Sequence, residues 1–103
     1  AQGTADRVEM GHLALDLKAA RVFLGGLPLE LPAREFEVLR ELMSPPGRAV
    51  SKRALSEKLS DMDDALGYNA LEAFISRLRK KLHGSGAGIR TLRGIGYLME
   101  EES

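Results

Sequence analysis

The chain has 103 residues, enough for one domain with its own core but too few for two. It contains no cysteine, which excludes a disulfide framework and a thiolate metal site, and no apolar run approaches the roughly 18 residues of a membrane span. Its 15 Lys/Arg and 15 Asp/Glu give a net charge of zero, which taken alone argues against a polyanionic partner.

The N-terminal third is predicted to form antiparallel strands. Leucine recurs at every second position along 13–17 and again along 27–31, which is the period of half-buried strands. Gly25-Gly26 supplies a two-residue turn, so residues 21–31 are expected to form a hairpin. A short strand at 8–10 would complete a small sheet.

Two helices are expected after this sheet. From Pro32 the apolar period becomes helical, and Pro45-Pro46-Gly47 ends the segment. The inward face of this first helix would hold Phe36, Leu39, Leu42 and Met43. Ser51 is the expected N-cap of the second helix, which would turn Leu55 and Leu59 toward the core.

The C-terminal half is predicted to contain an acidic loop, a third helix and a hairpin. The loop spans 61–67, the helix 68–82, and the glycine-rich stretch 84–88 ends the helix. Strands at 89–92 and 97–99 would form the hairpin. The element order is therefore a sheet, three helices and a final hairpin, an α+β fold.

Positive charge is concentrated in this half of the chain. Residues 68–93 hold six Lys/Arg and one Glu, a net charge of +5, whereas the last ten residues carry a net charge of −3. Because the screening length at about 0.15 M salt is about 8 Å, a local patch acts on a bound phosphate more strongly than the total charge does. The net charge of zero therefore does not exclude a polyanionic partner.

The third helix separates an apolar side from a polar and basic side. At about 100° per residue, its buried side would hold Leu71, Phe74, Ile75, Leu78 and Leu82. The opposite side would hold Asn69, Ala73, Ser76 and Lys80, flanked by Arg77 and Arg79. This order, small and polar first and basic later, is typical of a helix that reads base edges in the major groove of DNA.

A simpler interpretation of this helix stays open. Basic residues near a helix C-terminus oppose the helix dipole favourably, and most charge runs are solvated faces. The following hairpin strengthens the nucleic-acid interpretation, because an arginine near a glycine-rich tip, here Arg93, can enter a minor groove. The alternative is a hairpin held by packing, with Arg93 merely exposed.

Four segments together resemble a known family. They are 31–39 (LPAREFEVL), 48–55 (RAVSKRAL), 75–82 (ISRLRKKL) and 89–97 (IRTLRGIGY). In order and spacing they are similar to the OmpR/PhoB-type winged-helix effector domain of bacterial response regulators. The resemblance implies a winged helix-turn-helix with an N-terminal antiparallel four-stranded sheet, three helices and a C-terminal hairpin wing. It also implies control of transcription downstream of a sensor kinase.

The resemblance covers about residues 7–100. Residues 1–6 lack the features of a secretory signal and are expected to be a linker or a cloning remnant of a cytoplasmic protein, with 101–103 as a tail. The receiver domain usual in the family lies outside this chain, so we expect an output module that binds double-stranded DNA at repeated half-sites. The acidic loop, with Asp61, Asp63 and Asp64, would face RNA polymerase.

Site residues carry over by position. Base contacts are implied for Asn69, Ala73, Ser76 and Arg77. Contacts with the DNA backbone, or from the wing, are implied for Lys52, Arg53, Arg79, Lys80, Thr91 and Arg93.

The chain also departs from the family pattern. Pro32-Ala33 replaces a Thr-Pro pair, so the first helix lacks the Thr cap, and Ser60 replaces a common Trp. Ala73-Phe74 replaces Val-His; we expect Phe74 in the core and transfer no histidine contact to it.

No enzyme, metal or cofactor is expected. His12 and His83 have no partner at ligand spacing, and the serines lack a nearby activating base. A winged-helix module that binds protein is the alternative function, and RNA binding is disfavoured because the chain has only five aromatic residues. No apolar surface stripe is left over, so we expect the isolated domain to be monomeric.

Overall fold

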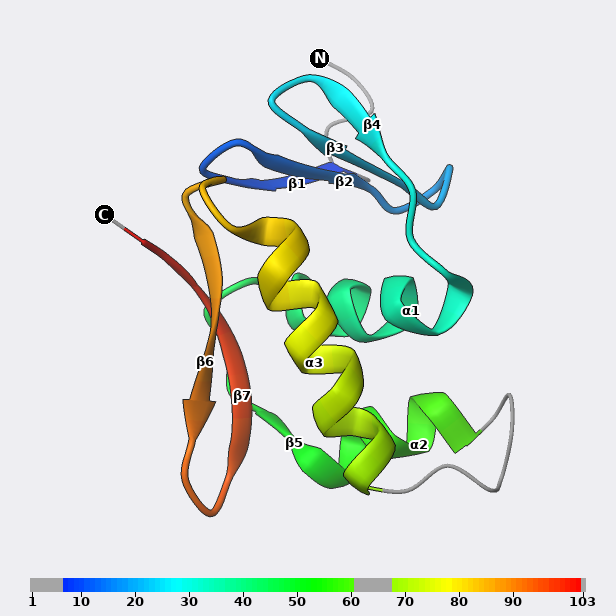
Figure 1. Ribbon diagram of the computed structural model, residues 1–103, viewed down its shortest axis with the longest axis vertical. Helices are drawn as coiled ribbons and strands as arrows, with labels where there is room; N and C mark the ends of the chain where they lie inside the picture. The colour runs from blue at the N-terminus through cyan, green and yellow to red at the C-terminus, as the bar shows by residue number, and fades with distance from the viewer. Residues whose placement is uncertain (1–6, 61–67, 103) are drawn as a thin grey trace.

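The computed structural model describes residues 7–60 and 68–102, apart from the side chains of Ser60, Tyr68 and Asn69. A four-stranded sheet lies at one end of the molecule, three helices lie beneath it, and a long hairpin runs beside the last helix (Figure 1). The order along the chain is β1 (Arg7–Met10), β2 (Leu13–Asp16), β3 (Arg21–Leu24), β4 (Leu27–Leu29), α1 (Ala33–Leu42), β5 (Val50–Ser51), α2 (Lys52–Ser60), α3 (Tyr68–Leu82), β6 (Ala87–Leu92) and β7 (Gly96–Glu101). The expected winged-helix architecture is confirmed.

The N-terminal sheet is antiparallel throughout, in the order β1-β2-β3-β4. The predicted hairpin is present as β3 and β4, joined at Gly25-Gly26, where φ is +59° and +84° and glycine is therefore favoured. Leu15 pairs with Val22 in the register of β2 and β3, and both side chains are buried. The two-residue apolar period thus turns one face of the sheet onto the helices.

Helices α1 and α2 begin as the sequence indicates. Pro32 is the N-cap of α1 and no side chain caps this end, in agreement with the missing Thr. Ser51 caps α2, because its Oγ accepts a hydrogen bond of 3.0 Å from the Ala54 N–H. Every apolar residue predicted to face inward from the two helices is buried: Phe36, Leu39, Leu42, Met43, Leu55 and Leu59.

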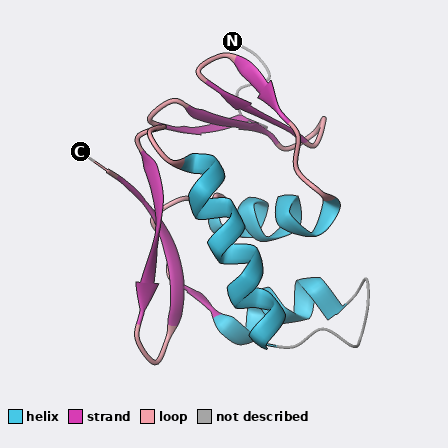
Figure 2. Cartoon of the chain, viewed as in Figure 1, coloured by secondary structure: helices cyan, strands magenta, loops and turns pink. Residues whose placement is uncertain are grey.

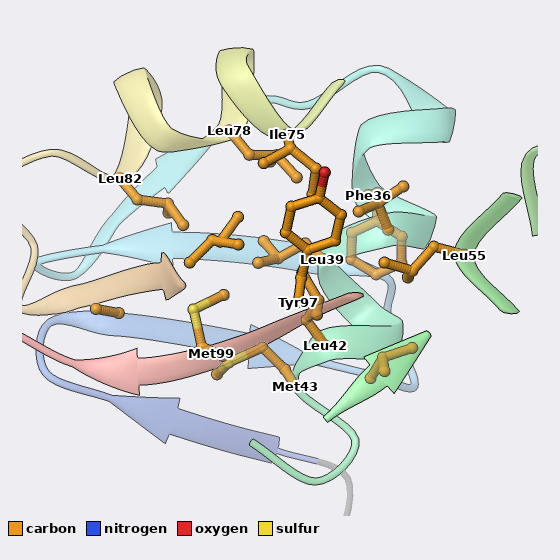
Figure 3. Packing of buried hydrophobic residues seen from close by; sticks show 14 of the residues in the cluster. Phe36, Leu39, Leu42, Met43, Leu55, Ile75, Leu78, Leu82, Tyr97 and Met99 are labelled. Carbon is orange, nitrogen blue, oxygen red and sulfur yellow. The ribbon is translucent and has the colours of Figure 1, made fainter. Parts of the chain in front are cut away.

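The apolar side of α3 closes the core between the other helices and the hairpin. Leu71, Ile75, Leu78 and Leu82 are each at most 1% exposed. In Figure 3 three of them, Ile75, Leu78 and Leu82, surround Tyr97 and Met99 of the hairpin together with leucines of α1. Phe74 differs from the prediction: it is only half-buried and packs at the edge of this core.

The hairpin β6–β7 forms a second sheet with β5, a short strand that the sequence pattern did not predict. The strand order is β5-β7-β6, and Ser51 pairs with Gly96. The backbones approach so closely here that a Cβ on Gly96 would collide with the carbonyl of Val50. The hairpin is therefore fastened at its β7 side to the start of α2. Both strands also extend beyond the predicted 89–92 and 97–99.

The described helices are all too short or too polar to be membrane spans; within 7–60 and 68–102 none meets that requirement.

Candidate nucleic-acid interface

The predicted outward face of α3 is exposed. Ala73, Ser76, Arg77 and Lys80 are all accessible, opposite the buried Leu71–Leu82 seam. Asn69 lies in the first turn of α3, but its side chain is outside the described part of the chain. The helical period therefore predicted correctly which side of α3 meets solvent.

Arg77 is held by an aromatic ring. The Cζ atom of Arg77 lies over the ring of Phe74, 5.4 Å from the ring centroid. This distance is within the range of a cation–π contact. The predicted core residue Phe74 thus forms the surface on which the predicted base-reading arginine rests. The misplacement has a simple cause: Phe74 lies at the border of the apolar arc, where helical periodicity cannot separate core from rim.

Arg79 joins α3 to the hairpin. Its Nε donates a hydrogen bond of 3.1 Å to the Ile89 carbonyl, and its Nη2 donates one of 2.6 Å to Thr91 Oγ1. Two predicted DNA-contacting residues, Arg79 and Thr91, are therefore bonded to each other. The sequence offered no sign of this pair, because the two residues belong to different elements. A phosphate contact by either residue stays a prediction.

Lys81 is held on the inner side of the helix. Its Nζ forms an ion pair of 2.7 Å with Glu35 Oε1 in α1, and the side chains are 33% and 3% exposed. Glu35 was not singled out in the sequence, although it lies four positions before Leu39 and so on the apolar side of α1. Because of this contact, Lys81 does not contribute to the outward basic face.

The start of α2 lies beside the turn of the hairpin. The Lys52 N–H donates a hydrogen bond of 3.4 Å to the Ile95 carbonyl in this turn. Arg53 is exposed and pairs with Glu57 at 3.3 Å, a contact that solvent weakens. The Lys52–Ile95 hydrogen bond brings Lys52 next to the turn that carries Arg93, although the two are far apart in the sequence. Figure 2 shows the hairpin turn and the neighbouring short helix at the end of the molecule opposite the four-stranded sheet.

The cations of this region differ in whether they have anionic or hydrogen-bonding partners. Among the described residues, Arg48 and Lys58 pair with Glu41, and Arg90 pairs with Glu100. In the same part of the chain the side chains of Lys52, Arg77, Lys80 and Arg93 form no hydrogen bond or ion pair. These four cations come from α2, α3 and the hairpin turn.

The predicted loop residues Asp61, Asp63 and Asp64 lie outside the described residues.

The exposed end of the hairpin is partly apolar. Ile95 is 58% exposed, next to the exposed Arg93 and to Gly94, whose φ of +77° forms the turn. The arrangement is thus a helix with a small, polar and cationic outer face, flanked by cations from a helix N-terminus and from a narrow hairpin. A polyanion with grooves matches these features better than a small ligand does.

Comparisons with known proteins agree with this arrangement. Residues 26–99 match the family described as "Transcriptional regulatory protein, C terminal". A probable transcriptional regulatory protein of Sinorhizobium fredii, y4xI, is 42% identical over 101 residues, which cover 96% of this chain and 45% of that protein. The chain thus spans less than half the length of this relative.

Solved structures show the same fold. The DNA-binding domain of CpxR from E. coli has a TM-score of 0.77 and 31% identity, covering 94% of this chain and 98% of that one. The Klebsiella pneumoniae RstA DNA-binding domain, solved in complex with the RstA box, has a TM-score of 0.72 and 32% identity, covering 89% of this chain and 94% of that one.

Proposed function

Since this chain belongs to the family of C-terminal, OmpR/PhoB-type domains of transcriptional regulatory proteins, we propose that it binds duplex DNA sequence-specifically and is the output domain of a response regulator. The observation that carries the proposal is the exposed face of α3, where Arg77 and Lys80 have no anionic partner among the described residues while the apolar seam is fully buried. Residues 7–100 would form the binding domain.

Helix α3 would enter the major groove. The small side chains of Ala73 and Ser76 let the backbone approach the groove floor, and the Ala73 methyl can meet a thymine methyl. Arg77 can offer two parallel hydrogen bonds to guanine O6 and N7. Asn69, in the first turn, would contact a base edge near the helix N-terminus.

Phosphates would be contacted on both sides of this groove. Lys80 extends from α3, while Lys52 and Arg53 stand at the N-terminus of α2, where the helix dipole also favours an anion. Arg79 uses Nε and Nη2 for the hairpin, so its Nη1 is the atom we assign to a phosphate. Thr91, in the hairpin, would contact a phosphate of the same DNA strand as Arg79.

Arg93 would enter the adjacent minor groove. It stands at an exposed turn of a narrow hairpin, and β5 and the Lys52 N–H fix the base of that turn. Narrow A·T-rich stretches concentrate negative potential there, which attracts an arginine without reading an individual base.

The longer relatives extend the proposal to the whole protein. Because the chain corresponds to 45% of the y4xI regulator, we infer a receiver domain and a cognate sensor kinase for the complete protein, acting in the cytoplasm. RNA polymerase would be contacted through the loop with Asp61, Asp63 and Asp64. We further propose that the isolated domain is monomeric and that two copies bind neighbouring half-sites.

Binding to fragmented genomic DNA and to total RNA at several salt concentrations tests the proposal. We expect retention of duplex DNA over RNA, and a logarithm of affinity that falls linearly with the logarithm of salt at about −0.9 per phosphate contact. Selection from a random duplex pool then identifies the preferred sequence. Failure to retain any duplex at low ionic strength would contradict the proposal and favour a protein-binding module.

A further inference from the structure

The contact between Phe74 and Arg77 gives one residue of α3 a role that lies outside the predicted site. We propose that Phe74 is a positioning residue whose ring holds the Arg77 guanidinium ready to read a base. The inference rests on the proposed DNA-binding function and deepens it. On this view Phe74 determines how sharply one base pair is read without itself being the reading group.

The two residues are well placed for such a role. They are three positions apart on α3, so their side chains are neighbours on the helix surface. Phe74 is half-buried and packs against the core, which fixes its ring, whereas Arg77 is exposed. The Cζ–centroid distance of 5.4 Å places the cation over the ring. A side chain anchored in the core thus supports an exposed one.

A ring is a suitable support for this purpose because of how it binds a guanidinium. The attraction comes from the negative face of the π system and leaves the in-plane N–H donors available. A carboxylate or carbonyl partner would instead consume those donors. Arg79, two residues later, shows the contrast: its Nε and Nη2 are already bonded to Ile89 and Thr91.

The other arginine–ring contact in the described residues is of a different kind. Arg7 lies 5.7 Å from the centroid of Phe23, but its Nε also pairs with Glu9 at 2.9 Å. Arg77 has the ring contact without an ion pair in the described part of the chain. Its two parallel donors therefore stay available for guanine O6 and N7.

Preorganisation of this kind affects discrimination more than general affinity. A long side chain held in its binding conformation loses less freedom when it pairs with a base. An exposed cation–π contact has a strength that corresponds to about a two- to fivefold change in equilibrium. We expect that factor in the preference for the selected duplex over duplexes changed at the position Arg77 reads.

The test compares Phe74→Leu with Phe74→Tyr. Leucine keeps an apolar side chain against the core but removes the ring, whereas tyrosine keeps the ring. The probe is the duplex enriched from a random pool by the unsubstituted domain, with variants changed one base pair at a time. The position to follow is the base pair at which Arg77→Ala abolishes the preference for the selected sequence.

We expect Phe74→Leu to lower discrimination at that position about two- to fivefold and to leave the other positions unchanged. Phe74→Tyr, which keeps the ring, should retain the discrimination of the unsubstituted domain. In a domain that already carries Arg77→Ala, adding Phe74→Leu should change neither the affinity for the selected duplex nor the discrimination at that position. If Phe74 had only a structural role, Phe74→Leu would still lower the affinity of that domain. Unchanged discrimination in Phe74→Leu, or an equal loss in both backgrounds, overturns the inference.

A measurement on the unsubstituted domain covers the case in which Phe74→Leu does not fold. The protons of the Arg77 side chain should show ring-current shifts in the NMR spectrum that are absent from the exposed Arg53 and from Arg77 in the same domain carrying Phe74→Met. Ordinary shifts for Arg77 in the unsubstituted domain overturn the inference. If no duplex is enriched, the proposed function itself fails; if duplex DNA binds and Phe74 has no effect, only the inference fails.

Discussion

Arg79 and Thr91 are joined by a hydrogen bond of 2.6 Å from a guanidinium Nη2 to a hydroxyl Oγ1, across the junction of α3 and β6. The same guanidinium donates to the Ile89 carbonyl at 3.1 Å. One side chain therefore fastens the third helix to the first strand of the hairpin. This link holds the hairpin at a set angle to α3. A duplex that takes α3 in one groove and the hairpin in the next groove would have to fit that angle.

Replacing Thr91 by Val should loosen this junction. The substitution keeps the shape of the side chain but removes the acceptor of the Arg79 bond, so we expect a loss of about 1 kcal/mol in the free energy of unfolding. Urea denaturation measures it. Thr91→Ser retains the hydroxyl and should retain the stability. A Thr91→Val domain as stable as the unsubstituted one would show that the bond contributes nothing.

Replacing Arg77 by Ala should relax sequence preference. If Arg77 forms two hydrogen bonds with a guanine, its removal costs about 1–3 kcal/mol of binding and reduces selectivity at one base pair. Titration against the selected duplex and a scrambled duplex separates the two effects. Equal losses on both duplexes would remove the base-reading role of Arg77.

Replacing Lys80 by Ala should weaken binding evenly. A single phosphate contact has no sequence preference, so matched and scrambled duplexes should lose affinity alike, and the salt slope should become shallower by about 1. Lys18→Ala is the matched control, because Lys18 is also exposed but lies in the turn between β2 and β3. An equal effect of both substitutions would show that only total charge matters.

Replacing Lys81 by Met should destabilise the fold. The substitution leaves Glu35, whose side chain is 3% exposed, without its ammonium partner at the α1–α3 contact. Because Lys81 itself is one-third exposed, we expect a loss of about 2 kcal/mol, below that of a fully buried pair.

The double substitution Glu35→Leu with Lys81→Met is the control for this pair. Removing both charges should recover most of the stability, because no unpaired carboxylate is left in the core. Urea denaturation of the single and double variants measures the coupling. Additive losses would mean that the two side chains do not stabilise each other.

Much of the fold could be predicted from local patterns. The turn at Gly25-Gly26, the cap at Ser51 and the seam from Leu71 to Leu82 each depend on residues within a few positions of one another. Strand β5 could not be predicted, since its two residues carry no period and form a strand only by pairing with β7. Phe74 lies at the border of the seam, where periodicity does not decide burial.

The amino-acid sequence alone determined the elements of this protein other than β5, the inward faces of those elements except at Phe74, and the family to which its motifs belong, because helical and strand periods and capping are local. Only the tertiary structure decided which cations remain available for a polyanion. The ammonium of Lys81 is engaged by Glu35, 46 positions away, and Nη2 of Arg79 by Thr91, 12 positions away, so that Arg79 keeps Nη1 for a phosphate. Lys80, between them, has no such partner in the described chain. Such contacts depend on how the elements pack against one another, so a local sequence pattern cannot predict them.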